Sequence, residues 1–437
     1  MYCGGCLRDN ALVAALRKLG HQALLVPLYL PLTLDEEDQS AGTPLFFGGI
    51  SVYLEQKSPL FRGAPGWLHD LFASRRLLQW AAGKAAKTRA ADLGELTLSM
   101  LRGEAGHQAR ELEALLAWLK TQPRPDVLCL SNALLIGLAR RLKAELRVPV
   151  ACALQGEDAF LDGLPESQRA ACWRALAERA AEVDLFIAPS RYFGSLMGQR
   201  LGLPAERVRV VHNGINLEGY GEENRGAGAE SLSGPRPSTL DPQPSPPVLG
   251  FFARMCREKG LDTLVEAYLL LRQRGRVGNL KLRVGGSCSP ADAAFVKTLR
   301  ERLQAGGLLG DVEFHPNLDR ARKLALLRSF SVFSVPALYG EAFGLYVIEA
   351  LAAGVPMVQP RTAAFPELIE ATGGGVLCAA GDARALAEAV EGLLLDPARA
   401  RALGEAGRRA VAERFSAEAM ARGMLRVYGE LLNGLHR

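Results

Sequence analysis

Short apolar segments alternate with helical patterns along most of the chain. This alternation is typical of parallel sheets whose strands are joined by crossover helices. The strands predicted before a polar stretch are Ala23–Leu28, Val127–Leu130, Val150–Leu154, Leu185–Ala188 and Val208–Val211. Those predicted after it are Val248–Phe252, Leu280–Val284, Val312–Phe314, Val332–Val335, Pro356–Gln359 and Gly375–Cys378. Two such series predict an α/β protein with two Rossmann-like, doubly wound parallel-sheet domains that face an active-site cleft.

The join between the two series is visible in composition. Residues 221–247 contain almost nothing apolar and are rich in Gly, Pro and Ser, which predicts a flexible linker or insertion. The predicted domains are therefore residues 1–220 and residues 248–414. A last helix, Ser416–Leu432 within residues 415–437, has Ser416 as its N-cap.

The beginning of the chain departs from a doubly wound pattern. The Gly-rich segment Tyr2–Cys6 comes at once and is followed by a predicted helix, Leu7–Leu19. A doubly wound domain is expected to open with a strand that leads into such a loop. Either the start codon is assigned too late or the domain lacks a central strand. We favour the first alternative, because a missing central strand leaves unpaired neighbours and a hole in the core.

Composition narrows the class of protein. The chain of 437 residues is long enough for two domains, and 49% hydrophobic with 23% charged residues predicts a folded soluble protein. Basic residues are spread without a nucleic-acid motif, so we expect no nucleic-acid partner. Several of the eight cysteines lie in apolar runs, as buried free thiols do. With neither a signal-peptide pattern nor an apolar run of membrane-spanning length, we expect a cytoplasmic protein.

Two carboxylates spaced eight residues apart, Glu341 and Glu349, are the main functional signal. Glu349 lies in a predicted helix of residues 344–353, whose start is marked by Gly344. A helix N-terminus offers unpaired backbone N–H groups and a positive dipole end, which suit a phosphate. Carboxylates accept hydrogen bonds from sugar hydroxyls. The pattern therefore suits a sugar attached to a phosphate.

Two cations follow the predicted strand Val248–Phe252. Arg254 lies at its carboxyl end, where α/β proteins bind ligands, and Lys259 precedes the next helix. Together they suit a diphosphate and would stabilise the negative charge that builds on a leaving group. The alternative for any lone Arg or Lys is an ordinary surface charge, which fits Arg257 better.

The segment EAFGLYVIEALAAGVP resembles the Glu-x7-Glu motif of retaining GT-B glycosyltransferases of family 4 (glycosyl transferases group 1). FARMCREKG and VVHNGINLEGY resemble further family segments in the same order. The resemblance implies that Glu349 binds the ribose hydroxyls and that Glu341 lies near the transferred sugar. It also implies that backbone N–H groups of Phe343, Gly344 and Leu345 meet the phosphate and sugar, and that the last helix returns to the first domain.

Other candidates follow strand ends. By resemblance, Gly4 and Gly5 border the donor, and Gly285 and Asn317 are predicted to line the nucleotide pocket. On the acceptor side the candidates are Gln155, Glu157, Asp158 and Arg191. Glu157 and Asp158 either bind acceptor hydroxyls or cap the following segment. Many family members carry a His near Gln155, and this chain has none there.

The amphipathic basic stretch Trp67–Arg89 suits either a membrane-surface helix or, more commonly, a core-packed helix with a solvated face. We favour the core-packed helix, and peripheral contact with the inner membrane face is the alternative. Cys3 and Cys6 form a C-x-x-C without a second pair, so neither redox nor zinc chemistry is predicted.

The sequence thus predicts a retaining glycosyltransferase, a hexosyltransferase that moves a sugar from a nucleotide-diphosphate-sugar, UDP-linked by preference, to a carbohydrate or lipid-linked hydroxyl acceptor. No Asp-x-Asp metal motif occurs, so a metal-independent enzyme without cofactors is expected. One alternative is a catalytically silent GT-B module that binds a sugar or nucleotide. A sugar-nucleotide epimerase is a weaker one.

Overall fold

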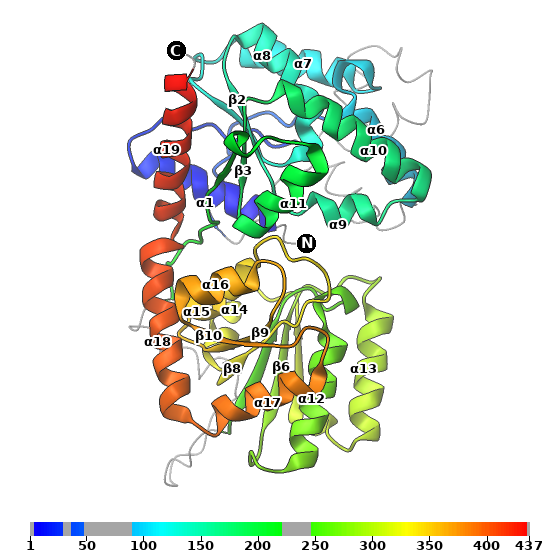
Figure 1. Cartoon of the computed structure of the whole chain (residues 1–437), viewed down its shortest axis with the longest axis vertical. Helices are drawn as coiled ribbons and strands as arrows, with labels where there is room; N and C mark the ends of the chain where they lie inside the picture. The colour runs from blue at the N-terminus through cyan, green and yellow to red at the C-terminus, as the bar shows by residue number, and fades with distance from the viewer. Residues whose placement is uncertain (1–3, 29–35, 48–89, 221–245, 435–437) are drawn as a thin grey trace. The chain divides into compact units, whose positions relative to one another are not determined.

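The computed structural model describes residues 4–28, 36–47, 90–220 and 246–434, which form two compact units (Figure 1). The N-terminal unit comprises residues up to His212 together with residues from Ala421 onward, and the C-terminal unit comprises Asn213–Met420. The predicted linker up to residue 245 and the stretch Trp67–Arg89 lie outside the described residues. In the part of the chain that is described, no helix is both long and apolar enough to cross a membrane.

The N-terminal unit is built on a parallel sheet of strand order β1-β2-β3-β4. Its strands are β1 (Leu128–Leu130), β2 (Val150–Ala153), β3 (Leu185–Ala188) and β4 (Val208–Val210). Its α-helices are α1 (Gly4–Lys18), α6 (Ala90–Leu101), α7 (Ala109–Leu119), α8 (Ala139–Leu146), α9 (Glu157–Asp162), α10 (Glu166–Arg179) and α11 (Arg191–Leu201). Its 3₁₀ turns are η2 (Gly103–Ala105), η3 (Ala133–Leu138), η4 (Ala180–Glu182) and η5 (Ala205–Arg207).

Two predictions for the N-terminal unit are wrong. Ala23–Leu28 is not a strand: its only recorded pairing is a single bridge between Leu28 and Phe46. A strand needs a neighbour along its length, and among the described residues this segment has none, whatever its composition. Gly4 and Gly5 do not form a loop either, because they are the first two residues of helix α1.

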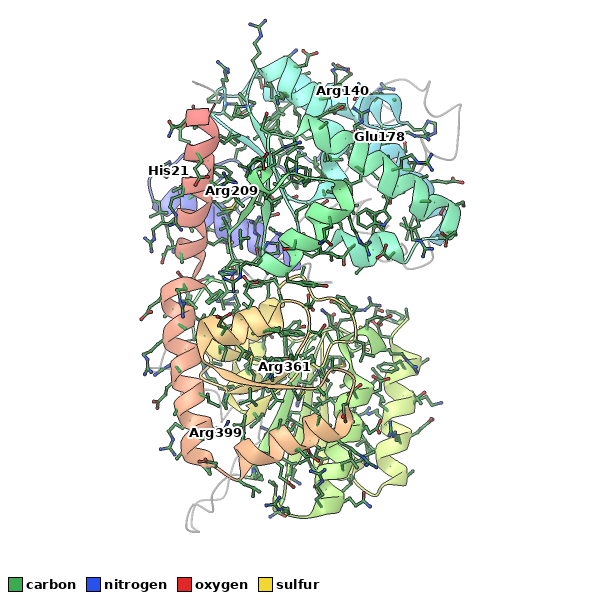
Figure 2. The ribbon with its side chains drawn as sticks, in the orientation of Figure 1. His21, Arg140, Glu178, Arg209, Arg361 and Arg399 are labelled. Atoms are coloured by element: carbon green, nitrogen blue, oxygen red, sulfur yellow. The ribbon has the colours of Figure 1, made fainter. Side chains whose placement is uncertain are left out.

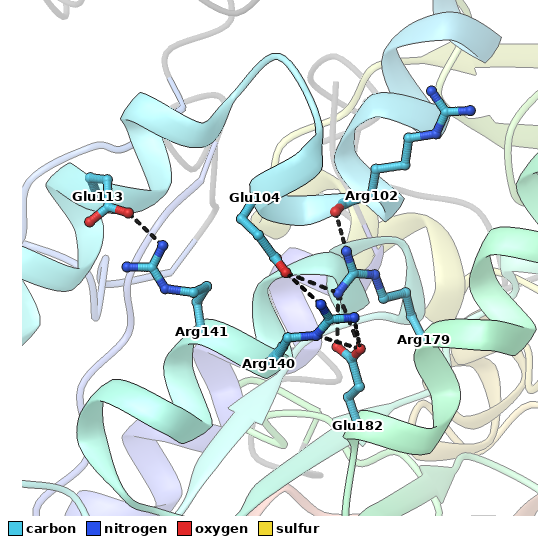
Figure 3. Close-up of polar contacts among 7 residues, drawn as sticks. All are labelled: Arg102, Glu104, Glu113, Arg140, Arg141, Arg179 and Glu182. Atoms are coloured by element: carbon cyan, nitrogen blue, oxygen red, sulfur yellow. Dashed lines mark hydrogen bonds and ion pairs between the residues drawn. The ribbon is translucent and has the colours of Figure 1, made fainter.

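Ion pairs join helical segments of the N-terminal unit (Figure 3). The guanidinium of Arg140 on α8 contacts Glu104 at 3.0 Å and Glu182 at 2.6 Å, so it links η2 to η4. Arg179, which is 8% exposed, also contacts Glu182, at 3.1 Å, and donates to the carbonyl of Arg102. The carboxylate of Glu182 thus pairs with both arginines. We infer that this network holds together three segments that are distant in the sequence: η2, α8 and the end of α10 with η4.

The C-terminal unit contains a six-stranded parallel sheet of order β10-β9-β8-β5-β6-β7. Its strands are β5 (Val248–Phe252), β6 (Lys281–Gly286), β7 (Val312–Pro316), β8 (Val332–Phe333), β9 (Met357–Pro360) and β10 (Gly375–Cys378). Its helices are α12 (Leu261–Arg274), α13 (Ala293–Ala305), α14 (Arg320–Arg328), α15 (Leu345–Ala352), α16 (Phe365–Thr372), α17 (Ala383–Leu394) and α18 (Pro397–Arg414), with 3₁₀ turns η7 (Arg257–Lys259) and η8 (Leu309–Asp311).

The strand order of the C-terminal sheet reverses between β5 and β8. From β5 the chain proceeds outward to β6 and β7, then crosses back to β8 and proceeds the other way to β9 and β10. Right-handed crossovers in opposite directions place helices on both faces of the sheet. Ligands of such sheets bind outside the carboxyl ends of the strands at this reversal. A ligand-binding site is therefore expected at the loops after β5 and β8.

Apolar side chains fix these two strands in the core. Phe251 of β5 and Phe333 of β8 are fully buried, as are Val347 and Leu351 of α15. The strands pair through Leu249 with Val332 and Gly250 with Phe333. Burial stabilises the folded state by roughly 25 cal/mol per Å² of apolar surface removed from water. The buried side chains therefore fix the ends of β5 and β8, from which the two loops begin.

The last helix, α19 (Ala417–Gly434), begins after Ser416, whose hydroxyl accepts a hydrogen bond from the N–H of Ala419 at 3.1 Å. Its later residues belong to the N-terminal unit. There Arg209 of β4, labelled in Figure 2, pairs with Glu430 at 2.7 Å. The sulfur of Met424 accepts a hydrogen bond from buried Arg8. The C-terminal helix is thus part of the packing of the first domain.

Candidate active site

A lysine and a glutamate meet at the reversal of the C-terminal sheet. The Nζ atom of Lys259, at the end of η7 after β5, lies 2.5 Å from Oε2 of Glu341, in the loop after β8. The side chains are only 17% and 12% exposed. The sequence predicts both as site residues, and the structure brings them together.

Gly260 explains how the loop after β5 reaches the loop after β8. Its φ of +71° favours glycine, and a Cβ atom added there would lie 1.9 Å from the carbonyl oxygen of Pro336. The N–H of Leu338 donates to the carbonyl of Glu258 at 3.0 Å. These contacts pack η7 against the loop after β8. They thereby place Lys259, the last residue of η7, next to that loop.

Two tyrosine rings surround the pair. The hydroxyl of Tyr346 donates to Oε2 of Glu341 at 2.7 Å, and that of Tyr339 donates to the same oxygen at 3.0 Å. Lys259 Nζ lies 4.8 Å from the ring centroid of Tyr339 and 5.0 Å from that of Tyr346, and it also donates to the Tyr339 hydroxyl. The ammonium group is thus held by one carboxylate and two aromatic faces.

This environment keeps Glu341 ionised. Burial alone would raise the pKa of its carboxyl group, but the charge of Lys259 and the hydrogen bonds from Lys259, Tyr346 and Tyr339 outweigh it, so the pKa is lowered. Burial and the neighbouring Glu341 charge raise the pKa of Tyr346 well above its ordinary value. Tyr346 therefore stays a hydrogen-bond donor, and Glu341 stays an acceptor.

The N-terminus of α15 lies beside this cluster. Gly344, its N-cap, has φ +87°, and a Cβ atom there would lie 3.3 Å from Cζ of Tyr346 and 3.4 Å from Cγ of Glu341. Among the described residues no acceptor is recorded for the N–H groups of Gly344, Leu345 or Tyr346, whereas the N–H of Val347 donates to the carbonyl of Gly344. Such N–H groups at a helix start suit an anion. Phe343, also predicted to contribute, is 2% exposed.

The second glutamate of the motif, Glu349, lies one helical turn further along α15. Its Oε1 atom lies 2.9 Å from Nζ of Lys323 on α14, and the two side chains are 15% and 10% exposed. A carboxylate held by one buried cation keeps its other oxygen as a hydrogen-bond acceptor. The pairing with Lys323 fixes the orientation of Glu349.

Arg254, the other predicted cation, follows β5. Its guanidinium donates to Asp292 at 2.9 Å, while its side chain remains 54% exposed. Burial acts to raise the pKa of Asp292, but hydrogen bonds from Arg254 and Ser289 outweigh it and the pKa is lowered. Asp292 thereby orients Arg254 and leaves it accessible to an anion.

The loops after β6 and β7 are tied to each other. The N–H of Asn317 donates to the carbonyl of Gly286 at 2.9 Å, and its side chain bonds both backbone groups of Cys288. Gly285 pairs in register with Phe252 of β5, beside Arg254. Gly285 and Asn317 therefore flank the same carboxyl edge as Arg254, and their role toward a nucleotide stays a prediction.

On the N-terminal unit, the two acidic candidates after β2 differ. Glu157 is 4% exposed, and its carboxylate accepts from the N–H groups of Ala133, Gln155 and Gly156 at 2.8–3.0 Å. Its oxygens are occupied by these backbone N–H groups, none of which belongs to the segment that follows Glu157. Asp158 is 8% exposed, and its Oδ1 has no hydrogen-bond partner among the described residues. Burial raises the pKa of Asp158.

The remaining candidates belong to the same unit. Gln155 lies between β2 and α9, Arg191 is the first residue of α11, and Gly4 and Gly5 form the first turn of α1. Their predicted contacts with donor or acceptor stay predictions. In the described ranges no cluster of three or more His, Cys, Asp or Glu side chains could hold a metal. Six cysteines of these ranges are free thiols: Cys129, Cys152, Cys172, Cys256, Cys288 and Cys378.

Sequence reasoning missed four residues of the site: Tyr339, Tyr346, Lys323 and Asp292. Tyr339 precedes the motif and Tyr346 lies inside it, at positions where an aromatic residue is expected to pack in the core. Lys323 and Asp292 lie 26 and 38 residues from their partners Glu349 and Arg254. A signal was available only for Tyr346, since position i+5 from Glu341 at a helix start is within reach of a side chain that points back toward the N-terminus.

Comparison with known proteins identifies two matching family models and several relatives. The family model "Glycosyltransferase Family 4" matches residues 92–218, and "Glycosyl transferases group 1" matches residues 238–410. A phosphatidyl-myo-inositol mannosyltransferase of Mycobacterium leprae is 38% identical over 127 residues, 29% of this chain and 34% of the relative. A D-inositol 3-phosphate glycosyltransferase of Rhodococcus opacus is 30% identical over 249 residues, 57% of this chain and 53% of the relative. The chain thus matches about half or less of the length of these relatives.

A solved structure shares the fold. HepE of Anabaena, determined in complex with UDP-glucose, superposes with a TM-score of 0.61 at 17% identity, over 94% of this chain and all of that chain. The two parallel-sheet α/β units have the GT-B architecture. The chain belongs to the group 1, family 4 glycosyltransferases.

Proposed function

We propose that this protein is a retaining, metal-independent glycosyltransferase that uses a UDP-sugar donor and a carbohydrate or lipid-linked hydroxyl acceptor. The observation that carries the proposal is the convergence of Lys259, Glu341 and the N-terminus of α15 at the reversal of the C-terminal sheet. Cations, open N–H groups and an ionised carboxylate meet there within one small region. That combination fits a sugar diphosphate.

In this proposal the second domain binds the donor. Lys259, Arg254 and the N-terminus of α15 stabilise the negative charge that grows on the diphosphate as the sugar leaves. Glu341 accepts a hydrogen bond from a hydroxyl of the transferred sugar, and Glu349 accepts one from the ribose. The bond from the anomeric carbon to the phosphate oxygen breaks, a bond to the acceptor oxygen forms, and the acceptor's proton passes to the leaving phosphate.

Several findings support metal independence, a UDP-linked donor and the class of acceptor in this proposal. Two side-chain cations at the site supply positive charge of the kind that a divalent metal supplies in other transferases, and the chain lacks an Asp-x-Asp motif. The GT-B neighbour HepE was solved with UDP-glucose, which favours a UDP donor. Relatives named for phosphatidyl-myo-inositol and D-inositol 3-phosphate favour a polyol or lipid-linked acceptor.

Donor turnover tests the proposal. The purified chain is incubated in EDTA with UDP-glucose, UDP-galactose, UDP-GlcNAc, GDP-mannose and ADP-glucose, and release of free nucleotide is measured with and without myo-inositol. We expect one UDP-sugar to be consumed by the wild type and not by Glu341→Ala. Proton NMR of the product then gives the anomeric configuration, with retention expected. Binding of a UDP-sugar without any turnover would favour the silent module.

A further inference from the structure

Glu341 receives all of its recorded hydrogen bonds on one oxygen. Lys259, Tyr339 and Tyr346 each donate to Oε2, and no donor within the described residues is recorded for Oε1. The side chain is 12% exposed, and Oε1 is absent from the fully buried, unpaired oxygens of the described residues. The carboxylate therefore has one anchored oxygen and one available oxygen.

Tyr346 is well placed to set this orientation. Its ring is 8% exposed and packs against Phe333 of β8 at 6.4 Å and Phe365 of α16 at 6.5 Å between centroids. A buried ring between two fixed elements has few alternative rotamers. Its hydroxyl is thus held over Gly344, 2.7 Å from Oε2 of Glu341, by the core of the domain rather than by the mobile end of a long side chain.

Lys259 alone cannot hold the Glu341 carboxylate in this orientation. In the proposed function its ammonium group also serves the diphosphate, and a flexible four-carbon side chain that changes partner does not hold a carboxylate still. Tyrosine hydroxyls are neutral and do not compete for phosphate charge. Anchoring by Tyr346 is therefore compatible with Lys259 turning toward a donor.

We propose that Tyr346 is a positioning residue that fixes Oε2 of Glu341, so that Oε1 is the single acceptor presented to the transferred sugar. This inference rests on the proposed function and adds a specificity device to it. An ionised carboxylate oxygen only accepts hydrogen bonds, so the sugar must present a hydroxyl to it. The device acts on the sugar and leaves the nucleotide contacts alone.

The test compares Tyr346→Phe with Tyr268→Phe. Tyr268 is also a buried tyrosine of the C-terminal unit, and its hydroxyl donates to the carbonyl of Leu280 at 3.0 Å, in the packing of α12. Both variants keep the ring. Tyr346→Phe loses the hydrogen bond to Glu341, whereas Tyr268→Phe loses the bond to Leu280 and the one that its oxygen accepts from Arg272 at 3.0 Å. The Kd of UDP and the Kd of UDP-glucose are measured by calorimetry, together with kcat/KM for the donor that the wild type consumes.

For Tyr346→Phe we expect the Kd of UDP within about twofold of wild type and kcat/KM lower by about 10- to 100-fold, the effect of one hydrogen bond to a charged group. The acid limb of its pH profile should move to higher pH, because Glu341 loses a donor that lowers its pKa. Tyr268→Phe should show neither change. A general loosening of the domain would weaken UDP as well.

The outcomes separate the two claims. If the wild type neither binds UDP nor consumes any UDP-sugar, the proposed function fails and this inference fails with it. If the wild type consumes a donor but Tyr346→Phe behaves as Tyr268→Phe does, or loses UDP and UDP-sugar affinity equally, only the positioning role is overturned. If the wild type binds UDP-glucose without turnover, the positioning role is tested by the ratio of the UDP-glucose Kd to the UDP Kd. The same ratio in wild type and Tyr346→Phe would refute the positioning role of Tyr346.

Discussion

Lys259 and Glu341 are 82 residues apart in the sequence, yet the ammonium nitrogen of the first lies 2.5 Å from a carboxylate oxygen of the second. The relationship depends on sheet topology. β5 and β8 are neighbours only because the strand order reverses between them, and each delivers one partner at its carboxyl end. The ion pair between Lys259 and Glu341 therefore forms only when the strands of this sheet adopt their order.

The pair should make the C-terminal unit sensitive to acid. The pKa of Glu341 in the folded protein is lowered from its ordinary value of 4.5, so the carboxylate stabilises the unit above that value. This stabilisation is lost as the pH falls from 4.5 through the lowered pKa. Glu341→Gln should therefore be less stable than wild type by about 1–3 kcal/mol at pH 7, with the difference shrinking below pH 4.5.

Tryptophan fluorescence does not report on that unit, because Trp67, Trp80, Trp118 and Trp173 all lie outside residues 213–420. Urea unfolding followed by circular dichroism, with hydrogen exchange of α15 peptides, measures the difference between pH 7 and pH 3.5. A gap between wild type and Glu341→Gln that stays constant across this range would show that the Glu341 pKa is not lowered.

Gly344 should not tolerate a side chain. Its φ is +87°, and an added Cβ atom would lie 3.3 Å from the Tyr346 ring. Gly344→Ala should cost about 1–3 kcal/mol of unfolding free energy from backbone strain, and it should weaken UDP binding by disturbing the start of α15. The matched control is Gly392→Ala in the last turn of α17, where no atom lies within 4 Å and the change should stabilise by up to about 1 kcal/mol. Equal effects of both changes would contradict this account of Gly344.

Lys323 and Glu349 should behave as a coupled pair. Removing one partner leaves a nearly buried charge unpaired, whereas removing both does not. We expect Lys323→Met and Glu349→Gln each to destabilise the C-terminal unit, and the double variant to cost less than the sum, with a coupling of about 0.5–3 kcal/mol. A double-mutant cycle by urea unfolding measures this, and strict additivity would show that the 2.9 Å contact contributes nothing.

The sequence predicted a large part of this fold, for identifiable reasons. Leu185–Ala188, Val248–Phe252 and Gly375–Cys378 are strands with the predicted bounds, because each is a short apolar run between turn signals. Ala23–Leu28 has the same composition and is not a strand. Strand formation needs hydrogen-bonding partners, and composition alone does not reveal whether a neighbour is present.

The candidate site was predictable to the level of residue types. Glu341, Lys259 and Gly344 were found from motif spacing and from the chemistry of helix starts. The partners that orient them, Tyr346 and Lys323, were not, because a pairing between loops depends on strand order and on which way each side chain points. Glu157 shows the converse: a carboxylate at a strand end looks functional until the three backbone N–H groups that occupy it are seen.

Calorimetric titration of UDP into wild type, Lys259→Ala and Lys297→Ala tests the donor site most directly. Lys297 is the matched control, since its side chain is 78% exposed on α13 and, among the residues that the structure describes, its only recorded ion pair is with Glu301. The account predicts saturable binding to wild type and Lys297→Ala, and affinity at least about tenfold weaker in Lys259→Ala. Equal affinity in all three folded proteins, or no binding by wild type, would contradict the claim that this site holds a nucleotide-sugar.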